Sequence, residues 1–199
     1  AVHADARLTA ATGMTALARA IEGLYSKHRH PISTGLALHA ARLLRVALPR
    51  SVAQPDDLEA RSDCLMASLM SGTASINAMV SIVHAIGHVV GPRWHLQHGI
   101  SHAMLLGPAL RRMLPSIGTD QRFVLEALGC DPAGSADQAA AALAALLATL
   151  PLPQRLRDVG IGASDLQAIA AETMNDYMMA NLPTPLTAAD VGALLEEAW

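Results

Sequence analysis

Aromatic side chains are scarce in this sequence: its 199 residues include two Trp, two Tyr and one Phe, or 3% in total. Strands favour aromatic and β-branched residues, so a sheet-rich core is not expected. Hydrophobic residues nevertheless make up 52% of the chain, which excludes a disordered protein. Ala, Leu, Val and Met must therefore fill the core, and this composition favours close-packed helices.

Charged residues are also few, at 16%, and the formal net charge is −3. The most basic stretch, residues 27–30 (KHRH), is short. Binding to nucleic acid by counterion release needs many clustered cations, so nucleic acid is excluded as a partner. The two cysteines, Cys64 and Cys130, have no Cys-x-x-Cys spacing, which is typical of free thiols in a reducing cytoplasm.

Long hydrophobic runs are missing as well. The longest nearly apolar stretch, residues 139–150, is too short and too rich in alanine to span a bilayer. Residues 1–11 do not resemble a signal peptide, so we expect a cytoplasmic protein without a membrane partner. The sequence also lacks a glycine-rich turn after a strand, the element that cradles dinucleotide phosphates, so this chain alone is not expected to bind NAD(P).

Helical periodicity is present instead, without the two-residue alternation of half-buried strands. We expect an all-α helical bundle that forms a single domain over residues 1–199, with a candidate subdomain boundary near 129–135. The third predicted helix is apolar nearly all round and is expected to be the central one. The first predicted helix has a threonine cap among residues 9–12 and ends near Tyr25, and the second runs from Pro31 to Leu48 with Pro49 as the stop. The third runs from Pro55 to His88 with a break at Gly91-Pro92, and the fourth from His98 to Arg112. Further helices are predicted at roughly 120–128, 136–150, 163–175 and 187–199.

Nine histidines are present, and five of them lie between positions 84 and 102. His84 and His88 are four residues apart on one predicted helix and share a face, and His98 and His102 repeat this spacing on the next helix. Imidazole binds Zn, Fe, Ni or Cu, so two such helices folded together predict a metal site or an acid–base site. The alternative is that these are ordinary core or surface histidines.

The stretch from Asn77 to His88, followed by Gly91 and His98-Gly99, resembles the signature of iron-containing (group III) alcohol dehydrogenases. The spacing of fourteen residues from His84 to His98 agrees with that signature. Further segments similar to this family lie at residues 12–22 (TGMTALARAIE), 156–161 (LRDVGI) and 181–187 (NLPTPLT). Segments similar to its maleylacetate reductase branch lie at residues 22–25, 30–32 and 98–103.

The resemblance implies an all-helical C-terminal domain that faces a dinucleotide-binding N-terminal domain, which this chain lacks. In metal-dependent members of the family a metal polarises the substrate oxygen while NAD(P) exchanges hydride. Carried over by position, His84 and His98 are ligands of Fe or Zn, and His88 is a catalytic residue in proton relay. Arg19 and His102 are expected in the substrate pocket.

Two metal-ligand positions of the family are changed in this sequence. The family aspartate is Thr15 here, and a family histidine is Arg19. Neutral threonine is a poor ligand and arginine cannot coordinate a metal, so the predicted site has lost half its ligands. The Arg19 guanidinium is expected either to hold a carboxylate or polarise a carbonyl in place of the metal, or to turn outward to solvent.

Three functions are compatible with the sequence. The first is the substrate domain of an NAD(P)-dependent alcohol dehydrogenase or maleylacetate-reductase-like enzyme. That enzyme would act on a small alcohol, aldehyde or keto acid, and the chain would need a nucleotide-binding half, either a missing domain or a separate chain, for activity. The second is a non-catalytic helical remnant of the family fold, and the third is a small metal- or anion-binding protein. Exposed apolar surface where the missing half would sit favours a homo-oligomer.

Overall fold

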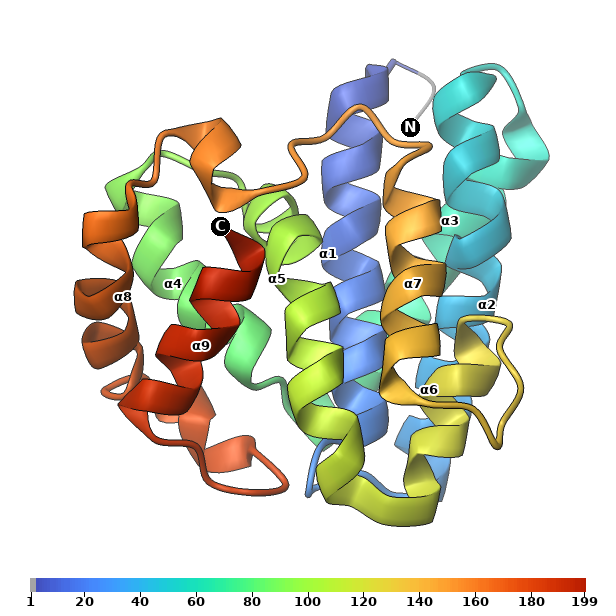
Figure 1. Cartoon of the computed structure of the whole chain (residues 1–199). Coiled ribbons are helices and arrows are strands. Elements are labelled where there is room, and N and C mark those ends of the chain that lie inside the picture. Colours follow the sequence, from blue (N-terminus) through green and yellow to red (C-terminus); the bar gives the residue numbers. More distant parts are fainter. Residues whose placement is uncertain (1–2) are drawn as a thin grey trace.

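The computed structural model describes residues 3–199, and all regular secondary structure in this range is helical, which confirms the predicted all-α bundle. In Figure 1, α4, α8 and α9 pack together beside a larger group formed by the other α-helices. The α-helices are α1 (Ala6–Tyr25), α2 (Pro31–Ala53), α3 (Leu58–Ala78), α4 (Ile82–Arg93), α5 (His98–Met113), α6 (Gln121–Ala127), α7 (Ala136–Leu147), α8 (Leu166–Thr173) and α9 (Ala188–Ala198). Short 3-10 helices are η1 (Leu114–Asp120), η2 (Leu156–Val159), η3 (Ala163–Asp165) and η4 (Tyr177–Asn181).

The central helix of the bundle is α1, which packs against α2, α3, α5 and α6. It starts after Asp5, whose side chain accepts a hydrogen bond from the Leu8 amide at 2.7 Å. The predicted threonine cap among residues 9–12 was therefore wrong, because Asp5 caps the helix earlier. Small residues on α1 allow close packing: a Cβ at Gly13 would lie 2.3 Å from a methyl carbon of Leu48.

The helix predicted over residues 55–88 is in fact two helices, α3 and α4. Met79 follows α3 with a φ of 66°, a left-handed conformation in which a right-handed helix cannot continue. The two helices are bent by 107° relative to each other. This bend returns the chain toward α1, where the start of α4 is hydrogen-bonded to Glu22.

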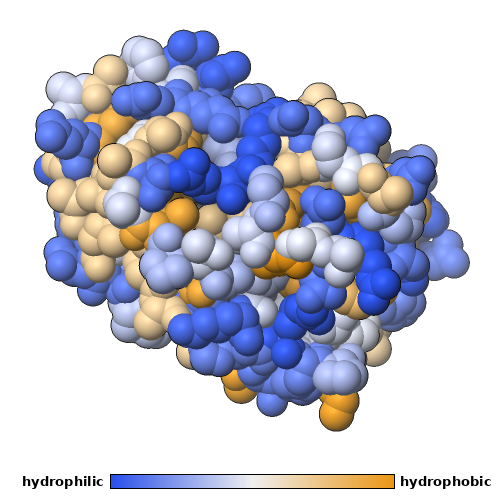
Figure 2. All heavy atoms as spheres, turned by 60° about the horizontal axis from the view of Figure 1, so that its bottom comes forward, coloured by the Kyte–Doolittle hydropathy of each residue, from blue (hydrophilic) through white to orange (hydrophobic). Residues whose placement is uncertain are grey.

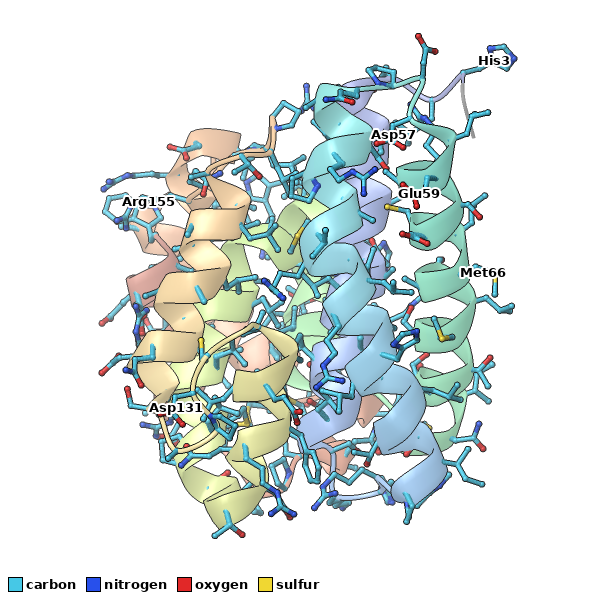
Figure 3. The ribbon with its side chains drawn as sticks, turned by 90° about the vertical axis from the view of Figure 1, so that its right-hand side faces the viewer. His3, Asp57, Glu59, Met66, Asp131 and Arg155 are labelled. Atoms are coloured by element: carbon cyan, nitrogen blue, oxygen red, sulfur yellow. The ribbon has the colours of Figure 1, made fainter. Side chains whose placement is uncertain are left out.

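Helix α3 lies at the edge of the bundle, so the prediction that this segment is the central helix was wrong. The exposed fractions of Leu65, Leu69 and Ile76 are 59%, 63% and 78%. Met66 also points away from the bundle in Figure 3. These four residues are called the α3 apolar face below. Periodicity predicted burial on most sides because apolar side chains occur around the helix, but no described element covers this face.

Two prolines expected to end helices lie inside them instead. Pro49 lies within α2, which continues to Ala53, and Pro92 lies within α4, which continues to Arg93. Each proline removes a single backbone hydrogen bond close to the C-terminal end of its helix, where few further turns depend on it. The predicted stop at Pro49 and the predicted break at Gly91-Pro92 were therefore wrong.

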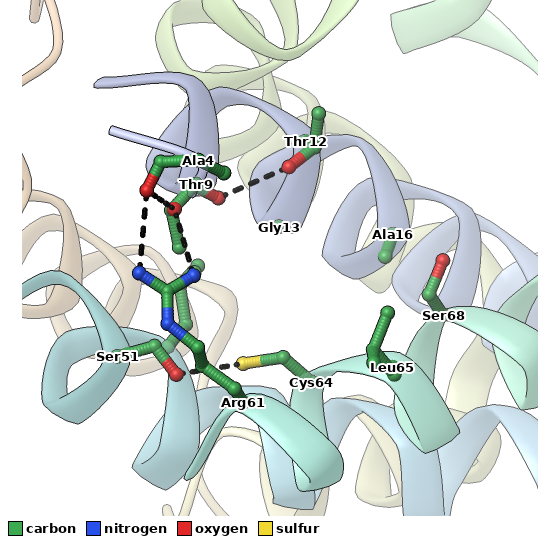
Figure 4. Close-up of a pocket in the computed structure, with 11 residues that line it drawn as sticks. Ala4, Thr9, Thr12, Gly13, Ala16, Ser51, Arg61, Cys64, Leu65 and Ser68 are labelled. Carbon is green, nitrogen blue, oxygen red and sulfur yellow. Dashed lines mark hydrogen bonds between the residues drawn. The ribbon is translucent and has the colours of Figure 1, made fainter. Parts of the chain in front are cut away.

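Arg61 joins α3 to the beginning of α1. Its guanidinium donates hydrogen bonds to the carbonyl of Ala4 at 3.2 Å and to the hydroxyl of Thr9 at 3.5 Å, as Figure 4 shows. Its Nε also donates to the carbonyl of Pro55. Because these acceptors belong to the chain itself, the small cavity of about 240 Å³ beside Arg61 is best explained as a structural junction.

The surface in Figure 2 mixes hydrophilic and apolar residues, and the apolar ones form separate patches on that face. Within residues 3–199 no single helix is long and apolar enough to cross a membrane. Joined end to end, α3 and α4 would be long and apolar enough to cross a membrane, but the two helices are sharply bent relative to each other. The last helix, α9, begins as expected from the sequence, since Thr187 and Asp190 form a reciprocal capping box.

Candidate active site

Four residues predicted from the sequence lie around one cavity of about 520 Å³. Arg19 reaches it from α1, His84 and His88 from α4, and His98 from the first position of α5. The rest of the wall is mostly apolar and comes from α3, the bend after it and η4. Its members are Gly72, Ser75, Ile76, Met79, Val80 and Met178.

The start of α5 lies directly against α1 because residue 99 is glycine. A Cβ at Gly99 would lie 1.6 Å from the carbonyl oxygen of Ala11, far closer than two atoms that are not bonded to each other can approach. The absent side chain therefore lets the two backbones touch. His98, the neighbouring residue, is held by this contact on the same side of the molecule as Arg19.

Glu22 is a fully buried carboxylate behind His84, and it was not predicted as a site residue. Its Oε1 accepts hydrogen bonds from the Val83 amide at 2.9 Å, the Tyr25 hydroxyl at 3.1 Å, and the Ser81 hydroxyl and amide at 3.1 and 3.2 Å. Its Oε2 contacts Nδ1 of His84. A carboxylate in this position fixes the orientation of an imidazole. His84 lines the cavity, and its Nε2 is buried and has no hydrogen-bond partner within residues 3–199.

His88 is also supported by a carboxylate. Oδ2 of Asp176 lies 2.7 Å from Nδ1 of His88, and Oδ1 of Asp176 accepts a hydrogen bond from the Met178 amide at 2.8 Å. The ring of Tyr177 stacks on His88 with 6.4 Å between the centroids. The His88 side chain is 31% exposed, so the nitrogen opposite Asp176 is accessible from the cavity. An oriented, accessible imidazole of this kind suits proton transfer.

His102, which the sequence predicted in the substrate pocket, lies one layer behind the cavity wall. It is fully buried, and its ring centroid is 4.2 Å from that of His84. Neither ring nitrogen has a hydrogen-bond partner among the described residues. Burial first, and then the charges of His84, His98 and Arg19, lower the pKa of His102 well below 6.5. A direct role of His102 in substrate binding stays a prediction.

The free energy of unfolding is expected to decrease as the pH falls below 6.5, because His102 stays neutral in the folded state while it takes up a proton in the unfolded chain. Because the pKa of His102 is lower in the folded state, its contribution to the free energy of unfolding is fully present above pH 6.5. This contribution is lost as the pH falls from 6.5 toward the pKa of the folded state. Urea unfolding on either side of pH 6.5 should show a weaker pH dependence for His102→Leu than for the unaltered chain. An equal dependence in the two proteins would refute this assignment.

The residues around the cavity do not fit the divalent metal that the sequence signature implies. Within the described part of the chain, no three His, Cys, Asp or Glu side chains come together as a metal-binding group. The Thr15 hydroxyl donates to the Ala11 carbonyl at 3.3 Å, and the positive charge of Arg19 in the same cavity wall repels a cation. Metal binding by His84 and His98 alone therefore stays a prediction that the neighbouring groups oppose.

Comparisons with known proteins cover the whole length of this chain. The family model described as "Fe-containing alcohol dehydrogenase family, C-terminal" matches residues 9–199. The 1,3-propanediol dehydrogenase of Klebsiella pneumoniae is 33% identical over 201 residues, covering 98% of this chain and 51% of the relative. The NAD-dependent methanol dehydrogenase of Bacillus methanolicus is 31% identical over 204 residues, covering 99% and 53%. The chain thus spans about half the length of the curated relatives it matches.

Solved structures give the same result. A 1,3-propanediol oxidoreductase structure superposes with a TM-score of 0.94 at 32% identity, covering 100% of this chain and 53% of the other. A maleylacetate reductase from Agrobacterium tumefaciens superposes with a TM-score of 0.88 at 26% identity, covering 100% and 54%. This chain therefore belongs to the Fe-containing alcohol dehydrogenase family and corresponds to the C-terminal domain of its longer members.

Proposed function

We propose that this chain is the substrate-binding half of an NAD(P)-dependent oxidoreductase, which interconverts a small alcohol and its aldehyde or ketone, keto acids included. The observation that carries this proposal is the His88–Asp176 pair in the wall of a cavity of about 520 Å³, a size suited to a small substrate. Nicotinamide bound by the other half would supply or accept the hydride.

His88 would supply the proton that balances hydride transfer. In the reducing direction the substrate carbon gains a hydride, and the substrate oxygen gains a proton from Nε2 of His88. Asp176, on Nδ1, orients the ring for this transfer. The apolar side chains of Met79, Val80 and Met178 keep water away from the reacting atoms.

The nucleotide-binding half is expected to cover the α3 apolar face. Ile76 belongs both to this face and to the cavity wall, so a domain seated on the face would also close the cavity. A contiguous exposed apolar surface beside a site is typical of an interface. The partner domain is either a separate chain or part of the same polypeptide. Homo-oligomer formation through the same surface stays a prediction.

The chain alone is expected neither to bind NADH or NADPH nor to oxidise them. In complex with a nucleotide-binding half it should oxidise one of them with small aldehydes or keto acids, measured by absorbance. His88→Asn in this complex is expected to lower kcat by a factor of about 10²–10⁴, the usual contribution of a general acid. Nucleotide binding, measured by fluorescence, should be unchanged.

His39→Asn provides the matched control, because His39 is an exposed histidine on α2 away from the cavity. Its kcat should equal that of the unaltered complex. The proposed function is wrong if His88→Asn turns over as fast as the control. It is equally wrong if the complex binds nucleotide but reduces no small carbonyl compound.

A further inference from the structure

Arg19 reaches the cavity without a carboxylate that neutralises its charge. Within residues 3–199 its guanidinium makes no hydrogen bond or ion pair. The carboxylates that support the cavity histidines are already engaged, Glu22 by His84 and Asp176 by His88. An unpaired guanidinium in a cavity wall favours an anionic ligand, above all a carboxylate, whose two oxygens match its planar fork.

The neighbouring imidazoles strengthen this preference. Among the described residues, the imidazoles of His84, His88 and His98 line the same cavity as Arg19, and no carboxylate does. The His84 side chain also lines this cavity, and its buried Nε2 has no hydrogen-bond partner among residues 3–199.

The rest of the cavity also suits a small organic acid. Its volume is about 520 Å³, and Ile76, Met79, Val80 and Met178 provide an apolar wall. Removal of water by these side chains strengthens the attraction between a guanidinium and a carboxylate, because the local dielectric falls. A neutral alcohol would gain no binding energy from the charge of Arg19, so the cavity is expected to bind anionic substrates more tightly than neutral ones.

We propose that the cavity binds a small oxo acid through its carboxylate, with Arg19 as the fixed positive charge at a position where the family pattern has a metal-ligating histidine. This assignment rests on the proposed function and specifies its substrate class. Two parallel hydrogen bonds from Arg19 hold the carboxylate, and the adjacent carbonyl group then lies toward His88. The guanidinium thus supplies, in place of a divalent ion, the positive charge that holds the substrate.

Calorimetric titration of the purified chain with 2-oxobutyrate and with uncharged 2-butanone tests this inference. We expect 2-oxobutyrate to bind at least about tenfold more tightly, and Arg19→Gln to abolish that difference. Arg19→Lys should retain part of it, because the charge remains while the planar fork is lost. Arg7→Gln, the same change at an exposed position of α1, should bind as the unaltered chain does.

A second variant tests the exchange of metal for guanidinium. Thr15→Asp combined with Arg19→His restores the family pattern, so this protein should bind about one Zn²⁺ per chain and lose its preference for 2-oxobutyrate. The unaltered chain should bind Zn²⁺ much more weakly. The inference is overturned if Arg19→Gln keeps full affinity for 2-oxobutyrate, if the unaltered chain shows no preference over 2-butanone, or if it binds Zn²⁺ as tightly as the double variant.

These titrations contain no nicotinamide, so they separate the two proposals. Binding of 2-oxobutyrate that depends on Arg19, together with a nucleotide-loaded complex that transfers no hydride, would support this inference and overturn the proposed function. Turnover of 2-oxobutyrate by the complex that is unaffected by Arg19→Gln would support the proposed function and overturn this inference.

Discussion

Gly99→Ala is expected to destabilise the protein by about 3 kcal/mol or more, at the upper end for overpacking substitutions. The new methyl group would lie 1.6 Å from the backbone oxygen of Ala11, and a backbone carbonyl cannot move aside as a flexible side chain can. Helix α5 would have to leave α1. His98 would then move away from Arg19, so the affinity for oxo acids should fall together with the urea midpoint.

Gly107→Ala provides the matched control on the same helix. A Cβ at Gly107 meets nothing within 4 Å, so alanine should raise the free energy of unfolding by about 0.4–1 kcal/mol by restricting the unfolded chain. Urea denaturation of both variants measures the difference directly. If Gly99→Ala unfolds at the same urea concentration as Gly107→Ala, the backbone contact between α1 and α5 is not as close as described.

Glu22→Gln is expected to lower the free energy of unfolding by about 3 kcal/mol, although it changes the side-chain volume very little. The amide nitrogen would replace an oxygen that faces Nδ1 of His84, so two donors would meet in a fully buried position. Burial, and then the charge of Glu22, raise the pKa of Tyr25 well above 10.0. The Tyr25 hydroxyl therefore keeps its proton and donates to the carboxylate.

The control for this change is Glu172→Gln, because the Glu172 side chain is 59% exposed and its only ion pair among the described residues is a long contact of 3.9 Å with Arg93. Its effect should stay within about 0.5 kcal/mol, as for most surface substitutions. Chemical denaturation gives both free energies, and the nitrogen chemical shifts of His84 report its tautomer. Equal stability of the two variants would show that the buried carboxylate is not needed for folding.

Much of the site was predictable because its residues carry strong local signals. Two histidine pairs at helical spacing predicted that His84, His88 and His98 lie together, and the structure brings them to one cavity with Arg19. The class of fold followed from the lack of aromatic residues and of strand-like alternation. These signals depend only on residues close to one another in the sequence.

The supporting carboxylates were missed because they depend on long-range contacts. Glu22 meets His84 only because the chain bends at Met79, and helical periodicity gives no sign of this bend. A single glutamate in the apolar stretch of residues 20–25 was the available signal. Asp176 lies 88 positions after His88, in a segment between α8 and η4 whose place beside α4 is fixed by packing. No local pattern predicts such a pairing.

The α3 apolar face explains the largest error about the fold. Periodicity reports which side chains avoid water, but it does not say whether the covering surface belongs to the same domain. In this chain α1 is the central helix, because its alanines and glycines allow neighbours to approach on every side.

Two of the three cavity histidines, His84 and His88, pair with carboxylates from different parts of the molecule. The partner of His84, Glu22, lies on the central helix, whereas the partner of His88, Asp176, follows α8 in the smaller group of helices. Both histidines lie on α4, which belongs to the smaller group, so partial opening between the two groups would release the His84 ring from Glu22 and leave the His88 ring paired with Asp176. The two imidazoles would therefore lose their fixed tautomers at different denaturant concentrations, His84 before His88, if the two groups separate before the smaller group unfolds.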